Sequence, residues 1–144
     1  MCLQRVIARF EPPKVEEVMG FKVVLQKDNV TRAPFARVPL RTDVWIAENR
    51  EIELGKVPDN YRCGFHVCET EKHAELVANF IEGHKTFVAN EWRVAVVPVM
   101  VREIVAEGYD CGAKVLVARQ IFCFREMPSV DNFGIDDWNE LVAA

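Results

Sequence analysis

The 144-residue sequence lacks the features that mark several large classes of protein. No apolar run approaches the length of a membrane-spanning helix, and no secretory signal follows Met1. The five cysteines are odd in number, which disfavours a disulfide framework. A basic excess is also missing, because the formal net charge is −4. We therefore expect a cytoplasmic protein that binds neither membranes nor, through a broad basic face, nucleic acid.

The fingerprints of common enzymes are missing as well. The chain has no P-loop, no glycine fingerprint for dinucleotides and no Ser-His-Asp spacing. Half of its residues are hydrophobic and 28% are charged, which is the balance of a folded protein. Without repeats or linkers, this length predicts a single domain over residues 1–128 and a C-terminal tail over 129–144. In the tail, residues 135–142 could form a short docking helix.

Most of the chain has the patterns of β-strands. Residues 21–26 alternate, so that Phe21, Val23 and Leu25 should face inward and Lys22 outward. Residues 92–106 and 114–124 are apolar on both faces and joined by a turn at 108–112, which predicts a central antiparallel pair. Further strands are expected at 3–10, 42–47 and 64–68. The residues between 48 and 61 form a charged connection that is either a functional loop or contains missed elements.

One helix is well marked in the sequence. Thr70 is a plausible N-cap, and apolar residues follow it at helical spacing: Ala74, Val77, Ala78 and Ile81. The predicted fold is therefore α+β, with a bent antiparallel or mixed sheet, this main helix packed on one face, and the short C-terminal helix.

His66 and Cys68 are two residues apart on one predicted strand, so their side chains should share a face. Cys63 precedes the strand, and zinc accepts these ligand types. The second pair of ligands would have to come from Cys111, Cys123, His73 or His84, none of which forms a compact knuckle. Buried apolar cysteines are the alternative interpretation.

His66 alone stands at the end of a strand and before a helix N-terminus, where main-chain N–H groups attract anions. It could therefore bind a ligand. The alternative is a partly buried histidine held by a backbone carbonyl.

Cys2 offers a different chemistry. Removal of Met1 would leave an N-terminal cysteine whose α-amine could act as a base for its own thiol. A cysteine that merely begins a strand is the alternative.

Arg119 is the lone charge among apolar neighbours on its strand. A buried charge needs a partner, and Glu103 on the adjacent segment is the expected one. Arg119 is either a substrate-binding residue or half of a structural ion pair.

Several short segments resemble small uncharacterised proteins of bacteria and tailed phages. The resemblance covers about residues 1–125 and rests on the Met-Cys-Leu start and on segments 20–24, 61–68, 107–108 and 115–119. Those proteins commonly have a Glu where this chain has Gln120. The resemblance implies a phage or mobile-element origin and no particular activity.

The strand at 64–68 and Ala74 in the following helix are also similar to the ADP-ribosyltransferase fold. That resemblance implies that His66 contacts the nicotinamide ribose of NAD. It places Lys22 at the first-strand position of the family and Glu126 nearest to its catalytic Glu.

These observations leave three functional expectations. The first is a small binding or accessory protein without a cofactor, which recognises a small molecule or a protein partner through residues such as His66, Arg119 and Lys22. The second is an NAD-using transferase in which His66 and Glu126 act. The third is an N-terminal nucleophile protein that uses Cys2.

Overall fold

A computed structural model describes residues 3–28, 30–33, 39–83 and 92–124. About 60% of these residues lie in strands and 11% are helical. The predicted α+β class is therefore wrong, because this part of the chain is a large antiparallel sheet with one helix. The short helix expected at 135–142 lies outside the described residues. The excess of strand arises in segments that the sequence patterns understate, notably 11–14, 53–54 and 107–110.

The elements follow one another along the chain as strands interrupted by the single helix. Their bounds are β1 Arg5–Lys14, β2 Val18–Lys27, β3 Val30–Arg32, β4 Trp45–Ala47, β5 Glu53–Leu54, β6 Tyr61–Arg62, β7 Phe65–Cys68, α1 Glu71–Glu82, β8 Arg93–Asp110 and β9 Ala113–Cys123. The charged connection before residue 61 thus contains a missed element, the strand β5, which pairs with β6 in a small separate sheet. Two-residue strands are too short to leave an alternating pattern.

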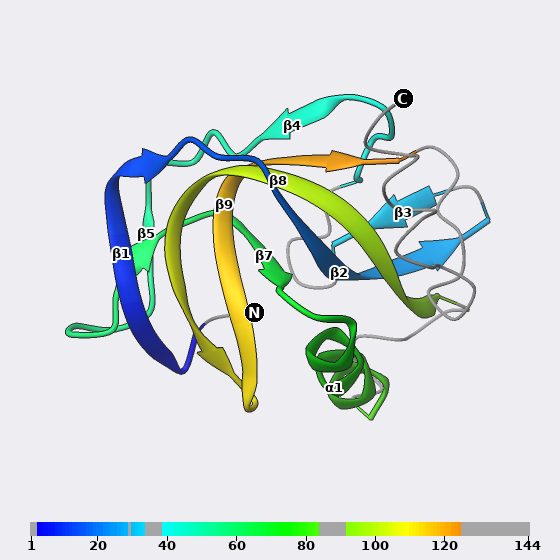
Figure 1. The fold of residues 1–144 in the computed structure, drawn as a ribbon. Helices are drawn as coiled ribbons and strands as arrows, with labels where there is room; N and C mark the ends of the chain where they lie inside the picture. The colour runs from blue at the N-terminus through cyan, green and yellow to red at the C-terminus, as the bar shows by residue number, and fades with distance from the viewer. Residues whose placement is uncertain (1–2, 29, 34–38, 84–91, 125–144) are drawn as a thin grey trace.

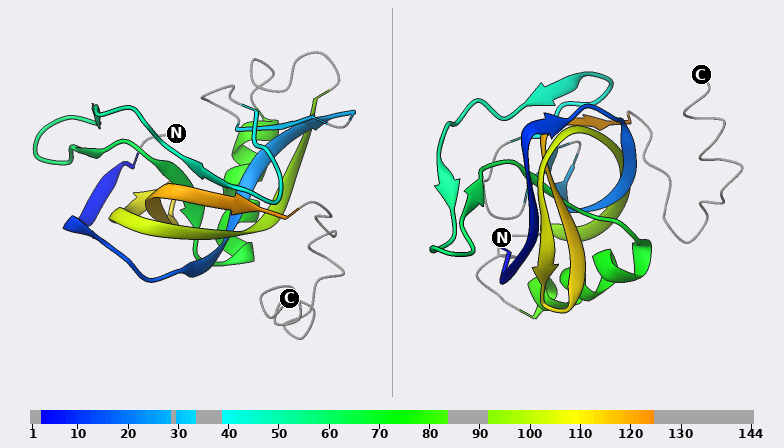
Figure 2. Two further views of the ribbon diagram at one scale, coloured as in Figure 1. Left: turned by 90° about the horizontal axis from the view of Figure 1, so that it is seen from above. Right: turned by 60° about the vertical axis from the view of Figure 1, so that its left-hand side comes forward.

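The main sheet closes on itself. β8 pairs with β2, β2 with β7, β7 with β9, and β9 again with β8, and every one of these pairings is antiparallel. β1, β3 and β4 extend this ring of four strands at its margins. Figure 1 shows β8 arching over β9, and the right-hand view of Figure 2 shows β2 and β8 curving round together.

The 18-residue strand β8 makes the closure possible because it changes partners along its length. Its first part pairs with β2, and its pairing with β9 begins at Val99. Pro98 therefore lies where β8 has a partner on one side only, as expected for a residue without an N–H group. The β8–β9 hairpin predicted from the sequence is confirmed. It turns through Cys111 and Gly112, both at positive φ, which is the geometry of a tight two-residue hairpin loop.

β1 extends to Lys14 through Pro12 and Pro13, beyond the strand that we expected at 3–10. Its register against β8 passes directly from Arg9 opposite Ala106 to Lys14 opposite Ile104. No residue of β8 is paired with the prolines, so their missing N–H groups leave no ladder bond unmade.

The core has two parts, one on each face of the central strands. Val115 and Val117 belong to the cluster that includes α1, whereas Leu116 and Ala118 belong to the other. This double burial explains the unbroken apolar run of β9. It also covers both faces of β2, so Lys22, which we expected to face outward, is buried.

The helix α1 confirms its sequence prediction. The Thr70 hydroxyl accepts a hydrogen bond from the main-chain N–H of His73, as an N-cap does, and the four predicted apolar residues are buried. α1 packs against β2, β7, β8 and β9 (Figure 1). It is the only helix in the described residues, and it is too short and too polar to cross a membrane.

Candidate functional site: a hollow around Arg119

His66 lies inside the protein and not at the rim of a cleft. Its residue is 7% exposed, and its Nε2 is 2.8 Å from the Tyr61 hydroxyl. The Tyr61 hydroxyl oxygen accepts a hydrogen bond from the main-chain N–H of Leu3 at 2.7 Å. The hydroxyl proton can therefore be donated to the ring nitrogen of a neutral His66. Burial, reinforced by the charge of Lys22, lowers the His66 pKa to about 3. The arrangement favours the structural interpretation of His66.

Lys22 is held close to His66 by a main-chain contact. Its Nζ donates to the His66 carbonyl oxygen at 3.0 Å, and burial lowers the pKa of the amine to about 8. The structure thus brings together two of the three residues expected to bind a ligand, but in the interior.

The remaining candidates from the sequence were metal ligands, the possible nucleophile Cys2 and the possible catalytic residue Glu126. In the described ranges, no three His, Cys, Asp or Glu side chains come close enough together to hold a metal ion. Cys63 and Cys68 are each 1% exposed, and burial raises the pKa of both thiols. Cys2, His84 and Glu126 lie outside the described residues, so the hypotheses that depend on Cys2 and Glu126 stay predictions.

Arg119 lines a hollow at the surface, and we call this the Arg119 hollow. Its volume is about 410 Å³. It lies where the connection between β4 and β6 passes β1, β8 and β9. Its lining residues come from all of these segments: Pro13, Ala47, Glu48, Asn49, Glu51, Arg62, Glu103 and Arg119.

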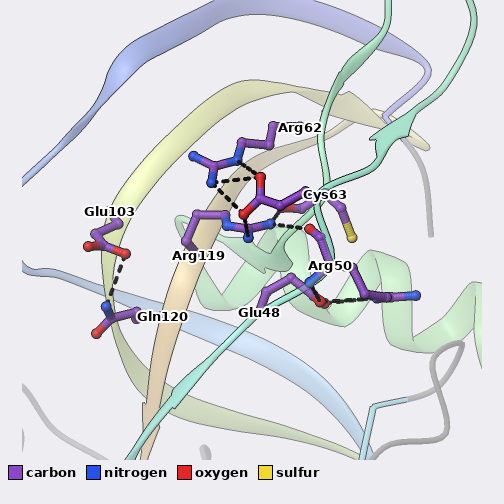
Figure 3. Close-up of polar contacts among 8 residues, drawn as sticks. Glu48, Arg50, Arg62, Cys63, Glu103, Arg119 and Gln120 are labelled. Carbon is purple, nitrogen blue, oxygen red and sulfur yellow. Dashed lines mark hydrogen bonds and ion pairs between the residues drawn. The ribbon is translucent and has the colours of Figure 1, made fainter.

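The Arg119 guanidinium is fixed by main-chain oxygens. Arg119 is 5% exposed, and its Nη1 donates to the carbonyl oxygens of Arg50 and Cys63 at 2.8 and 2.7 Å (Figure 3). Its Nη2 donates to Glu51 Oε1 at 2.9 Å. We expected Glu103 to be its partner, but the ion pair is made with Glu51, 68 residues away in the sequence.

Glu51 is shared between two arginines. Arg62 Nη2 lies 2.9 and 3.0 Å from the two Glu51 oxygens, and Arg62 Nε lies 3.2 Å from Oε2. The hydrogen bonds from Arg62 lower the Glu51 pKa, and the charges of Arg62 and Arg119 act in the same direction. The Glu51 side chain is nevertheless 67% exposed, so a surface carboxylate bridges one buried and one surface guanidinium.

Main-chain hydrogen bonds hold the connection that carries Glu51 on both sides of this residue. The Glu48 N–H donates to the Arg119 carbonyl oxygen at 2.8 Å, and the Cys63 N–H donates to Ile52 O at 2.9 Å. The Glu48 carboxylate is paired with Arg50, whose hydrogen bonds lower the Glu48 pKa (Figure 3). The main chain around Glu51 is therefore fixed while its side chain projects into solvent.

Glu103 enters the hollow from an unusual backbone position. Its φ is 58°, in the left-handed region that costs a residue with a Cβ about 1 kcal/mol or more. Gln120 Nε2 donates to Glu103 Oε2 at 3.0 Å (Figure 3). The Gln120 Oε1 accepts from Arg102 Nε at 2.6 Å. Gln120 thus orients Glu103 through an amide, which donates a hydrogen bond that an ionised carboxylate could not.

The charges in the hollow are separated into two sides. Glu48 is balanced by Arg50, while Glu51 is opposed by two arginines, which leaves one net positive charge on that side. Within the described residues, Glu103 accepts a hydrogen bond from the neutral Gln120 amide and makes no ion pair, so it supplies one negative charge on the other side. This pattern suits a molecule with an anionic group at one end and a hydrogen-bond donor at the other.

Comparisons with protein-family models, with curated proteins and with solved structures found no match for this chain. The geometry of the hollow is therefore the only basis for assigning a function to this chain.

Sequence reasoning found Arg119 but missed most of its neighbours. Glu51 and Arg62 belong to a stretch in which charged residues are frequent, so nothing in the sequence marks these two. Gln120 stands out in the sequence only because the proteins that the chain resembles commonly have a Glu there. The one available signal was the combination of a lone buried arginine and a long charged connection, since such a charge must find a partner.

Proposed function

We propose that this protein is a binding module that recognises a small polar molecule in the Arg119 hollow. The molecule carries an anionic group, which Arg62 and Arg119 receive, and a donor group, which Glu103 receives. The observation that supports this most is the Arg119 guanidinium. It is buried, fixed by two main-chain oxygens, and balanced only by an exposed carboxylate.

The number of donors on Arg119 supports the same interpretation. A guanidinium has five N–H donors, and the contacts within the described residues use three of them. One donor on Nη2 and one on Nε therefore have no protein partner there. Fixed charged donors at a surface hollow are well suited to an incoming carboxylate or phosphate.

The composition of the hollow favours binding over catalysis. Its lining contains no Cys, His, Lys, Ser, Thr or Tyr among the described residues. The pKa values of Glu48 and Glu51 are lowered, by hydrogen bonds from arginine, so neither carboxyl is suited to donate a proton at neutral pH. A volume of about 410 Å³ is in the lower part of the range for small-molecule sites.

The test is a ligand panel measured by thermal shift and then by calorimetry. The panel contains inorganic phosphate, nucleoside monophosphates, amino acids, dicarboxylates and NAD. A true ligand at 100 times its Kd should stabilise the protein by about 2.7 kcal/mol. Arg62→Gln removes one charged donor group and should weaken binding of that ligand by about tenfold or more.

The matched control is Arg93→Gln, which removes an exposed arginine that contacts Gln26 and does not line the hollow. It should bind as the wild type does. A panel without any shift, or equal affinities for wild type and Arg62→Gln, would overturn the proposal. Stabilisation by NAD that is independent of Arg62 would instead support the transferase hypothesis.

A further inference from the structure

We propose that Glu51 occupies the position of the ligand's anionic group, so that the ligand is a carboxylate and its binding displaces the Glu51 side chain. This inference rests on the proposed function, and it names the ligand class and the internal competitor.

The contacts of Glu51 are those expected of a bound carboxylate. Both of its oxygens face the Arg62 fork, and Oε1 is also within 2.9 Å of Arg119 Nη2. Three nitrogens of two arginines thus surround one planar group with two oxygens. Paired guanidinium donors of this kind match the plane of a carboxylate, with two parallel N–H···O bonds. The arrangement therefore indicates what the two arginines can hold.

Displacement of Glu51 requires only rotation of its side chain. The main chain is held at Glu48 and at Ile52, on either side of Glu51. The side chain is 67% exposed, whereas Arg119 is almost fully buried, so the carboxylate can swing into water while Arg119 stays in place. Arg119 keeps its two main-chain hydrogen bonds throughout.

An internal carboxylate weakens the apparent affinity of the site because it competes with the ligand. Exposed ion pairs are individually weak, so the competition is modest. We expect removal of the Glu51 charge to increase carboxylate affinity by about threefold to tenfold.

The experiment uses acetate and inorganic phosphate as probes, added at constant ionic strength to the full chain. Binding is followed through the Nε–H NMR signals of the arginine side chains. In Glu51→Gln the acetate Kd should fall about threefold to tenfold, with the Arg62 and Arg119 signals moving together. Glu75→Gln is the matched control, since Glu75 is an exposed carboxylate on α1 and does not line the hollow. Its acetate Kd should equal that of the wild type.

The outcomes separate the two proposals. If Glu51→Gln binds acetate no more tightly than the wild type, the competitor role is overturned while ligand binding in the hollow stands. An equal or larger gain for phosphate would overturn the assignment to carboxylates. If neither the wild type nor Glu51→Gln binds any probe or panel compound, the proposed function fails as well.

Discussion

His66 illustrates how a residue suggestive of function can have a structural role. The sequence places it on a strand before a helix N-terminus, a position that suits ligand binding. In the folded protein the ring is instead buried, and its Nε2 joins a hydrogen-bonded chain with the Tyr61 hydroxyl and the Leu3 N–H. A side chain's partners depend on long-range contacts, in this case across 58 residues between Leu3 and Tyr61, and no local pattern reveals them.

The low pKa of His66 predicts that acid destabilises the protein. The folded ring titrates near pH 3 and the unfolded ring near 6.5, so below pH 6.5 the unfolded state binds one proton more. Stability due to the neutral ring is fully present above pH 6.5. It should fall by about 1.4 kcal/mol per pH unit below that value and be lost as the pH approaches 3. Urea unfolding between pH 7 and 5 measures this slope before most carboxylates titrate.

Two variants isolate the contribution of His66. His66→Gln removes the titrating group, so its unfolding free energy should depend less on pH over this interval, whatever its value at pH 7. Tyr61→Phe should cost about 1 kcal/mol or more, because a buried N–H loses its acceptor, yet it should keep the wild-type slope. An unchanged slope in His66→Gln would show that other groups cause the acid sensitivity.

At the scale of elements, the accuracy of sequence reasoning depended on how local each signal was. The Thr70 cap and the apolar spacing of α1 are set within one segment, and both were predicted. The β8–β9 hairpin was also predicted, since two long apolar runs flank a glycine-containing turn. The extension of β1 beyond residue 10 was missed because it contains two prolines, which a gap in the β1–β8 register accommodates. The strand β5 was missed because two residues carry no periodicity.

Gly108 should be required where β1 pairs with β8, opposite Val6. A Cβ added there would lie 2.1 Å from the Arg5 carbonyl oxygen and 3.0 Å from Leu3 Cδ1. The nearer atom belongs to the main chain and cannot rotate away. Gly108→Ala should therefore destabilise the protein by about 3 kcal/mol, at the upper end of overpacking effects, as measured by chemical denaturation.

Gly83→Ala is the matched control for that measurement. Gly83 has a helical φ of −69°, and its added Cβ would meet only ordinary contacts of 3.5 Å or more. Its unfolding free energy should stay within about 0.5 kcal/mol of the wild type. Similar losses in both variants would contradict the close approach of β1 to β8.

At the scale of the whole molecule, the closed ring of strands is what the sequence could least reveal. Each of the four ring strands can be recognised by itself in the sequence. Closure, however, depends on β8 changing partners near Val99 and on β2 pairing with β7. The ring also buries both faces of β2, which turned Lys22 from an expected surface residue into an interior one. Arg119 was identifiable as a buried charge, whereas its partner Glu51 comes from a connection whose path only the assembled ring fixes.

Closure of the ring can be tested at the junction between β2 and β7, where Phe21 lies directly opposite Cys68. Opposed residues of antiparallel strands have Cα atoms about 4.5 to 5.5 Å apart, within the range that a disulfide spans. Phe21→Cys should therefore form a bond to Cys68 on mild oxidation, detected by peptide mapping without reductant. The bond should stabilise the protein by at most about 4 kcal/mol, less the lost packing of Phe21.

Met19→Cys, two residues earlier on β2 and opposite Met100, should leave Cys68 reduced. If Cys68 stays reduced in Phe21→Cys as well, under conditions of oxidant and pH that oxidise the buried thiols of the wild type, β2 and β7 are not adjacent and the sheet is open.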